Sequence, residues 1–253
     1  MTPRPDLARR AIRLLDLTDL SDSPSDRSTD ALCARALGPH GPVAAVCLWP
    51  QFVSRARRAL EGSGVRIATV ANFPRGDEDV ERVVDAVEEA LSDGADEIDL
   101  VMPYRAFLAG DEATARTMIA GVRDVVGRKR PLKVILETGM LAQPAAIEAA
   151  ARLAVAEGAD FLKTSTGKTP VSATPEAAEI LLGVIRGAGR PVGFKASGGI
   201  RTLDDAAVYL DLADRAMGPA WATPRTFRFG ASGLLDALVA EIEGGTAPGG
   251  ASY

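Results

Sequence analysis

Short apolar runs rich in valine and isoleucine recur along the chain at intervals of roughly 25–35 residues, with amphipathic segments between them, as in repeated strand–helix units. Eight of these runs are expected to be strands: 14–18, 43–49, 66–72, 97–102, 132–137, 161–165, 192–197 and 227–232. The intervening helical patterns, such as 77–94 and 144–158, are each closed by a glycine. Eight strands alternating with helices in 253 residues predict a single (β/α)8 TIM barrel.

We expect the barrel to occupy residues 1–243, with an extra helix before the first strand. Segment 244–253 is rich in glycine, alanine, proline and serine and is predicted to be a flexible C-terminal tail. A doubly wound open sheet is the alternative. It is disfavoured because no glycine-rich GxGxxG segment follows the first strand.

Composition excludes several classes of function. The net charge of −5 and the lack of a basic block argue against nucleic acid or an anionic membrane as partner. No apolar run approaches the ~20 residues of a membrane span, and the N-terminus lacks a signal-peptide core. Cys33 and Cys47 have neither metal-ligand spacing nor a disulfide framework around them, so a reducing, cytoplasmic location is expected. The single histidine, His40, cannot supply a His-based metal site or a catalytic triad, and we expect neither metal nor other cofactor.

Side-chain alternation along the strands predicts which groups enter the barrel. In run 97–102, Ile98 and Leu100 should face the helices and Asp99 the interior. The same alternation directs Cys47, Lys163 and Lys195 inward from three other strands. All four lie toward the C-terminal ends of their strands, where the active sites of such barrels are found.

Lysine is rare in this chain. Of 29 basic side chains only five are lysine, and three of these lie between positions 163 and 195. A guanidinium does not deprotonate and cannot form a Schiff base, whereas a lysine amine can. Lys163 and Lys195 are therefore candidates for chemistry. Lys129 and Lys133 are interpreted as remnants of the compositional bias.

Lys163 and Lys195 lie on adjacent predicted strands. Burial lowers the pKa of a lysine amine, and a second ammonium nearby lowers it further. One amine could then be neutral enough to attack a carbonyl while the other stays charged. The alternative is a buried lysine that simply pairs with Asp99. Two lysines and one carboxylate leave a net positive pocket, which favours the functional interpretation.

Glycine-rich segments follow the last three predicted strands. Ser197-Gly198-Gly199 follows the seventh and Gly230-Ala231-Ser232-Gly233 the eighth, where it opens the last helix. Small residues let backbone N–H groups approach an anion, and a helix N-terminus adds its dipole. These loops are the usual phosphate site of the barrel. Gly167 and Lys168 add a third element; ordinary turn glycines are the alternative.

The chain resembles the 2-deoxyribose-5-phosphate aldolases, a family of class I (Schiff-base) aldolases. The resemblance extends along nearly the whole chain and is carried by six segments: 16–20, 95–111, 133–139, 158–168, 193–202 and 227–232. It includes KTSTGK around Lys163 and GFKASGG around Lys195. Where some members have Pro-Ala after the second lysine, this chain has Ala196-Ser197. Gly233 stands where some members have a second serine, so position 233 offers no side-chain contact to phosphate.

The resemblance implies a role for each matching residue. Lys163 would form the imine, Lys195 would perturb it and Asp99 would handle protons. The residues implied to bind the sugar are Asp16, Thr18, Leu20, Cys47 and Thr166. Those implied to bind phosphate are Gly167, Lys168, Gly198, Gly199, Ser232 and Gly233. Some members also end in a flexible tail closing on tyrosine, which implies that Tyr253 assists protonation.

We expect the protein to cleave 2-deoxy-D-ribose 5-phosphate reversibly to acetaldehyde and D-glyceraldehyde 3-phosphate, as part of deoxyribose phosphate catabolism. Its partners would be the sugar phosphate and aldehydes, and a homodimer is possible. A Schiff-base lyase for a different sugar phosphate is one alternative. A non-catalytic sugar-phosphate sensor is another, although a sensor would not need both Lys163 and Lys195.

Overall fold

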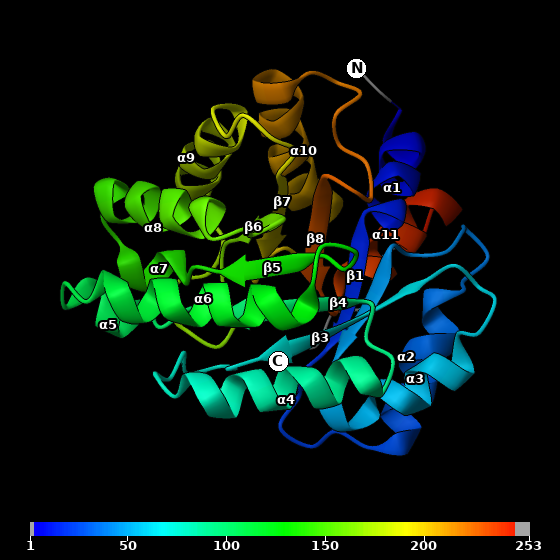
Figure 1. Ribbon diagram of the computed structural model, residues 1–253. Helices are drawn as coiled ribbons and strands as arrows, with labels where there is room; N and C mark the ends of the chain where they lie inside the picture. Colours follow the sequence, from blue (N-terminus) through cyan, green and yellow to red (C-terminus); the bar gives the residue numbers. More distant parts are fainter. Residues whose placement is uncertain (1–2, 246–253) are drawn as a thin grey trace.

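The computed structural model describes residues 3–245, which contain a closed barrel of eight parallel strands in the order of the sequence (Figure 1). The strands are β1 (Leu15–Asp19), β2 (Ala45–Leu48), β3 (Arg66–Ala71), β4 (Glu97–Val101), β5 (Leu132–Ile135), β6 (Phe161–Lys163), β7 (Gly193–Ser197) and β8 (Phe227–Ala231). β1 pairs with both β2 and β8, which closes the sheet and excludes the open-sheet alternative. The predicted (β/α)8 barrel is confirmed, and each strand falls within or next to its predicted run.

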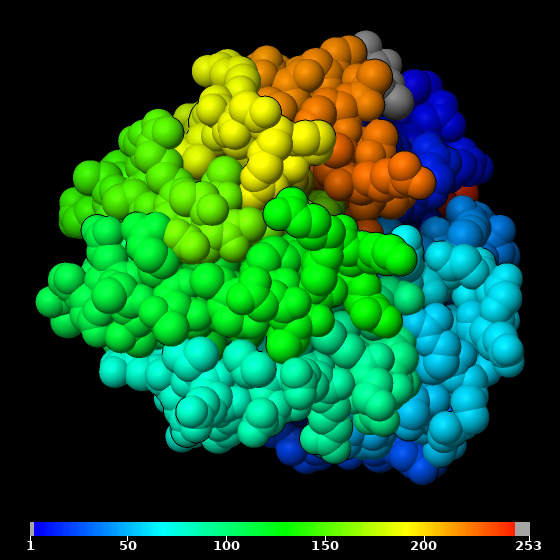
Figure 2. All heavy atoms as spheres, viewed as in Figure 1, coloured from blue at the N-terminus to red at the C-terminus, as the bar shows by residue number. Residues whose placement is uncertain are grey.

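Helices surround the barrel. Their bounds are α1 (Arg4–Arg13), α2 (Asp26–Ala36), α3 (Val53–Ala59), α4 (Val80–Ser92), α5 (Tyr104–Leu108), α6 (Glu112–Val126), α7 (Thr138–Leu141), α8 (Pro144–Ala156), α9 (Pro175–Arg186), α10 (Leu203–Met217) and α11 (Leu234–Glu243), with a 3-10 turn at Pro50–Phe52. Consecutive parts of the chain occupy consecutive sectors of the surface (Figure 2). None of the helices described between residues 3 and 245 is long and apolar enough to cross a membrane.

The extra N-terminal helix expected from the sequence is α1, which packs against α11. Arg4 joins the two helices through an ion pair of 2.6 Å with Glu241. Arg10 makes a two-pronged contact with Asp214 of α10, at 2.6 and 2.7 Å. The barrel therefore begins with a helix fixed to the last two helices of the shell.

Local signals in the sequence explain where the helices begin. The hydroxyls of Thr174 and Thr202 accept hydrogen bonds from the backbone N–H groups of Ala177 and Asp205, as N-caps do. Asp79 plays the same part for α4 by accepting from the N–H of Arg82. Pro175 follows Thr174 at the first helical position, where its missing N–H costs nothing.

The buried apolar side chains form two clusters. The larger one lies between the strands and the helical shell and includes Ile98, Leu100 and Val134, as alternation predicts. The smaller one lies within the barrel and consists of Leu20, Ala45, Cys47, Ala68 and Val70. The rest of the barrel interior is filled largely by charged side chains, which build the site described below.

The predicted C-terminal tail falls mostly on residues 246–253, and Tyr253 with it, outside the described residues. The last described helix, α11, ends at Glu243. The division into a barrel at 1–243 and a tail at 244–253 stays a prediction.

Candidate active site

Lys163 and Lys195 meet across neighbouring strands. They are register partners on β6 and β7, and the same oxygen of Asp99 accepts a hydrogen bond of 2.8 Å from each Nζ. All three side chains are buried, with 2 % of Lys163 exposed and none of the other two. The structure therefore brings together the three residues to which the sequence analysis gave the central chemistry.

Lys133 belongs to the same cluster, which corrects its interpretation as a compositional remnant. Its side chain is fully buried on β5, and its Nζ contacts the second oxygen of Asp99 at 2.8 Å and Glu97 at 2.6 Å. Because Leu132 and Val134 face the helices, alternation already directs Lys133 into the barrel. The same rule directs Asp99 inward and is sufficient to place Lys133 beside it. Lys129 is exposed, and nothing in the structure changes its interpretation.

Asp16 extends the cluster to the other side of the barrel. One oxygen of Asp16 accepts from Lys195 at 2.5 Å, and the other from Arg228 at 2.5 Å. Arg228 also donates to Glu97 at 2.8 Å. Sequence reasoning missed Arg228 and Glu97, although each alternates inward on its strand. Asp16 also lies 3.7 Å from Lys133, and its expected role at the sugar stays a prediction.

The buried network, as we name these seven side chains, contains four basic groups and three carboxylates among the described residues. Its members are Asp16, Glu97, Asp99, Lys133, Lys163, Lys195 and Arg228. If every group were ionised, one positive charge would be unmatched in a region with almost no solvent. A neutral Lys163 leaves three cations facing three carboxylates. Charge balance therefore favours loss of a proton from one lysine.

The surroundings single out Lys163 as that lysine. Desolvation lowers the pKa of Lys163, the ammonium of Lys195 lowers it further, and Asp99 only partly opposes them. Burial also disfavours the charged form of Lys195, but Asp16 and Asp99 outweigh it and raise that pKa. Asp99 and Glu97 do the same for the pKa of Lys133. The result is one amine of lowered pKa beside two amines whose pKa values are raised.

Asp99 is held strongly in its ionised form. Burial alone would raise the pKa of its carboxyl group, but Lys133, Lys163 and Lys195 hold that pKa well below its usual range. A carboxylate so stabilised is a weak base. The geometry therefore supports Asp99 chiefly as the group that fixes both amines, and its predicted part in proton transfer stays a prediction.

The residues expected at the sugar lie in two places. Leu20 and Cys47 belong to the small apolar cluster in the barrel, and Thr18 donates its hydroxyl proton to the carbonyl of Asp16 at 2.8 Å. Thr166 lies in the loop after β6, where its hydroxyl contacts Glu137 at 2.5 Å. Glu137 is fully buried, follows β5 and was missed by the sequence analysis. The binding roles of these residues stay predictions.

The glycine-rich loops expected to hold phosphate lie close together. Gly167, Gly198 and Gly199 have φ of 81°, 84° and 82°, in the region that favours glycine. A side chain on Gly198 would come within 2.5 Å of the Ser172 hydroxyl and 3.2 Å of the Gly167 backbone, so the loops after β6 and β7 touch there. This close approach requires glycine at position 198.

The third loop and Lys168 complete the expected phosphate set. Ser232 and Gly233 immediately precede α11, and Gly233 is its N-cap. Lys168 reaches Asp22 at 3.0 Å from the loop after β6. Within residues 3–245, no group of three or more His, Cys, Asp or Glu side chains is arranged to hold a metal ion.

Known proteins resemble this chain along almost its full length. Residues 11–237 match the DeoC/LacD family of aldolases. A deoxyribose-phosphate aldolase from Agrobacterium fabrum is 53 % identical over 239 residues, which cover 94 % of this chain and 92 % of that protein.

Solved structures agree with this relationship. A Toxoplasma gondii protein assigned as a deoxyribose-phosphate aldolase superimposes with a TM-score of 0.88 at 28 % identity, covering 95 % of this chain and 97 % of that one. A deoxyribose phosphate aldolase from Aeropyrum pernix, described as tetrameric, shares the fold with a TM-score of 0.74 at 24 % identity, covering 95 % of this chain and 92 % of that one. With two buried lysines on a shared aspartate inside the barrel and a family match over residues 11–237, the chain belongs to the DeoC/LacD family of aldolases.

Proposed function

We propose that this aldolase cleaves 2-deoxy-D-ribose 5-phosphate reversibly to acetaldehyde and D-glyceraldehyde 3-phosphate. The observation that carries the proposal is the position of Lys163, a buried amine of lowered pKa beside the charged Lys195. The identity of 53 % to the Agrobacterium fabrum aldolase supports the choice of substrate.

Cleavage begins with covalent attack. The neutral amine of Lys163 adds to the C1 aldehyde of the open sugar, and loss of water gives an iminium ion. A base removes the proton of the C3 hydroxyl, the C2–C3 bond breaks, and its electron pair passes into the iminium to give an enamine. The three-carbon aldehyde phosphate leaves at this stage. Protonation of the enamine at C2 and addition of water then release acetaldehyde and regenerate Lys163.

Lys195 and Asp99 prepare this chemistry. Lys195 lowers the pKa of Lys163, and its ammonium is placed by Asp16 and Asp99. A water molecule held by Lys195 and Asp99 could relay the proton from the C3 hydroxyl, which is general acid–base help worth roughly 10²–10⁴-fold. We further propose that the phenol of Tyr253 assists protonation at C2. Tyr253→Phe would then slow exchange of the methyl protons of acetaldehyde with deuterated water and leave imine formation intact.

The phosphate would be held by the loops after β6, β7 and β8. Two observations support this phosphate site: the loops after β6 and β7 touch at Gly167 and Gly198, and Ser232 lies at the start of α11. Binding energy from a remote phosphate helps to position the reacting carbon. A cytoplasmic location is proposed with the enzyme, because Cys33 and Cys47 are both free thiols, as expected in a reducing compartment. Assembly into a homodimer or a larger oligomer is proposed as well.

Borohydride trapping tests the function. The protein is incubated with deoxyribose 5-phosphate, reduced, digested and weighed by mass spectrometry. We expect an adduct on the peptide that contains Lys163, together with release of both aldehydes. An adduct on Lys195 or Lys168 would contradict the assignment.

Two comparisons address the alternatives. Deoxyribose without phosphate should react far more weakly than the phosphorylated sugar, and equal efficiency would show that the glycine loops are only turns. If another sugar phosphate gives faster turnover, the Schiff-base mechanism stands and the substrate is wrong. Binding of the sugar phosphate without any adduct would identify a sensor.

A further inference from the structure

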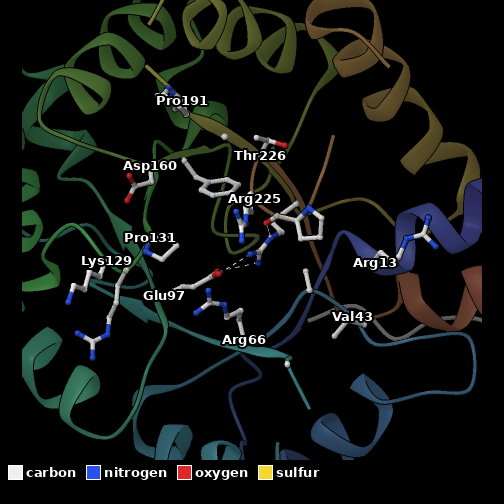
Figure 3. Close-up of a pocket in the computed structure, with 18 of the residues that line it drawn as sticks. Arg13, Val43, Arg66, Glu97, Lys129, Pro131, Asp160, Pro191, Arg225 and Thr226 are labelled. Atoms are coloured by element: carbon white, nitrogen blue, oxygen red, sulfur yellow. Dashed lines mark hydrogen bonds and ion pairs between the residues drawn. The ribbon is translucent and has the colours of Figure 1, made fainter. Parts of the chain in front are cut away.

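A cavity of about 640 Å³ opens at the opposite end of the barrel, where the strands begin (Figure 3). Its walls come from the first residues of β3, β4, β6 and β7, from Arg228 of β8 and from the loops that lead into the strands, so it lies away from the glycine-rich loops. A volume of this size is within the ~300–1,000 Å³ range of pockets for small molecules. Glu97 and Arg228 of the buried network line its inner end, whereas Asp99, Lys163 and Lys195 do not line it.

The walls of the cavity are strongly basic. Seven of its twenty lining residues are arginine or lysine and two are acidic, in a chain that has 34 acidic and 29 basic residues overall. Both acidic groups are already paired. Glu97 contacts Lys133 at 2.6 Å and Arg228 at 2.8 Å, and Asp160 contacts Arg123 at 2.6 Å. The cavity therefore concentrates uncompensated positive charge in an otherwise acidic protein.

Two of the arginines point toward the middle of the cavity. In Figure 3 the guanidinium groups of Arg66 and Arg225 converge near Glu97, while Lys129 and Arg13 point outward. Among the described residues Arg225 makes no ion pair, and the single ion pair of Arg66 is a loose 3.8 Å contact with Asp96. Arg228 closes the floor, held by Glu97 and Asp16. Arg66 and Arg225 thus have donors available for a ligand.

Part of the positive charge has another explanation. The negative ends of helix dipoles attract basic residues, and Arg13 and the 128–130 segment lie at or just after the C-termini of α1 and α6. Arg66 and Arg225 do not follow a helix end so closely: α3 ends at Ala59 and α10 at Met217. Helix dipoles therefore do not account for the two arginines that converge.

The rim of the cavity is stiff. Four prolines lie along it: Pro42, Pro131, Pro191 and Pro224. Proline fixes its backbone φ and has no N–H, so the rim is held in shape but offers few backbone donors. Recognition would rest on the guanidinium groups, which bind phosphate oxygens in pairs. A rigid rim also lowers the entropic cost of binding.

We propose that this cavity binds a small molecule with two or more phosphate groups. Converging arginines around a recess match a compact polyanion, whereas the acidic excess of the chain as a whole disfavours an extended one such as nucleic acid. The site shares no residue with the proposed phosphate loops. The proposal therefore stands whether or not deoxyribose 5-phosphate is the substrate.

Calorimetric titration with inorganic tripolyphosphate tests the proposal. The cavity variant is Arg66→Gln with Arg225→Gln, both exposed positions, and the matched control is Arg27→Gln with Arg58→Gln, two exposed arginines of α2 and α3. We expect the affinity for tripolyphosphate to fall at least tenfold in the cavity variant, and to stay within about twofold of wild type in the control, because each lost guanidinium removes charge-assisted hydrogen bonds. Equal losses in both variants would show only general charge attraction.

Hydrogen-exchange mass spectrometry locates the ligand independently. Tripolyphosphate should protect peptides that contain residues 64–66 and 224–228 in the wild type, and should not do so in the cavity variant. Protection confined to residues 166–172 and 230–233 would place the anion in the phosphate loops and overturn the proposal. Unchanged affinity in the cavity variant would also overturn it and leave these arginines a structural role.

Discussion

At the N-terminal end of the barrel interior, Glu97 is held by both Lys133 and Arg228, while at the C-terminal end Lys163 contacts a single carboxylate, Asp99, that it shares with two other lysines. Both places are buried and both are charged. The difference lies in the partners. In the lower part of the interior, at the N-terminal end (Glu97, Lys133 and Arg228), every charge has a partner. In the upper part, at the C-terminal end (Asp99, Lys163 and Lys195), the amine of Lys163 has only a carboxylate that it shares. Burial then lowers the pKa of that amine.

This comparison suggests a division of labour along the barrel axis. A fully paired buried network stabilises little compared with apolar packing, but breaking it is costly. The lower part can therefore hold Asp16 and Asp99 in place for the upper part, where the proposed chemistry occurs. Substitutions in the lower part should change stability most, and substitutions in the upper part should change turnover most.

The largest expected effect is on Lys163. Lys163→Arg replaces an amine that can lose its proton with a guanidinium that cannot, so we expect turnover to fall by about 10⁴-fold or more. Borohydride adducts should disappear. Substantial turnover by this variant, or a trapped adduct elsewhere, would show that the upper part of the barrel is not organised around Lys163.

Lys133 provides the corresponding test of the lower part. Lys133→Met leaves Asp99 and Glu97 each without one buried partner, so we expect the free energy of unfolding to fall by about 3–5 kcal/mol. Lys129→Met is the matched control, because Lys129 is exposed, and should change it by less than about 0.5 kcal/mol. Denaturant titration of the three proteins measures the difference.

The same variant makes a second, independent prediction. Without Lys133, the carboxylate of Asp99 interacts with one fewer cation, so it stabilises the ammonium form of Lys163 more strongly. The pKa of Lys163 should rise, and the pH at which borohydride trapping is half-maximal should rise with it. An unchanged trapping profile would mean that the two parts of the barrel interior are not coupled through Asp99.

The strands and the inward positions of Asp99, Lys163 and Lys195 can be predicted from the sequence, for a physical reason. Strand parity and apolar runs are local, so Asp99, Lys163 and Lys195 could be directed inward without knowledge of any partner. Glu97 and Arg228 obey the same parity, but their pairing joins β4 to β8 across the closed barrel and lies 131 residues apart in sequence. Such a partner becomes visible only when the barrel closes.

Two further residues show where local reasoning stops. For Lys133 the compositional bias toward arginine suggests a remnant, whereas strand parity correctly directs its side chain into the barrel. Glu137 adopts a left-handed backbone, with φ of 57°, at the end of β5, where it accepts hydrogen bonds from Thr166 and Thr169. Sequence periodicity cannot predict that a carboxylate in a loop of this conformation is buried. Its contacts come from the loop after β6, which no residue near Glu137 in the sequence could reveal.

Substitutions at two interior glycines are expected to have smaller effects, one in each part of the barrel interior. In the lower part, a side chain on Gly193 would come within 2.4 Å of the Phe161 ring. Gly193→Ala should therefore reduce stability by about 1–3 kcal/mol through overpacking. Turnover by the protein that remains folded should change little.

In the upper part, a side chain on Gly230 would come within 2.5 Å of the Ser197 hydroxyl and 3.0 Å of the Lys195 side chain. Gly230→Ala should displace Lys195 and lower kcat/KM by roughly 10- to 100-fold, because small misplacements of a reacting group are felt strongly. Steady-state kinetics and denaturant titration of both variants give the result. A loss of stability alone in both would remove the proposed division between the two parts.

The smallest expected effect concerns Cys47, which belongs to the apolar cluster inside the barrel, whereas Cys33 lies in the helical shell. Two acetaldehyde molecules can condense to an unsaturated aldehyde, which a thiol near Lys163 could capture. Burial raises the pKa of both thiols, that of Cys33 to about 11, so little thiolate is present and capture should be slow. Cys47→Ala should therefore extend the half-life in concentrated acetaldehyde by only a few-fold, while Cys33→Ala behaves as the wild type. Residual activity and peptide mass measure both; equal inactivation of the two variants would show that Cys47 is a packing residue rather than part of the reactive end of the barrel.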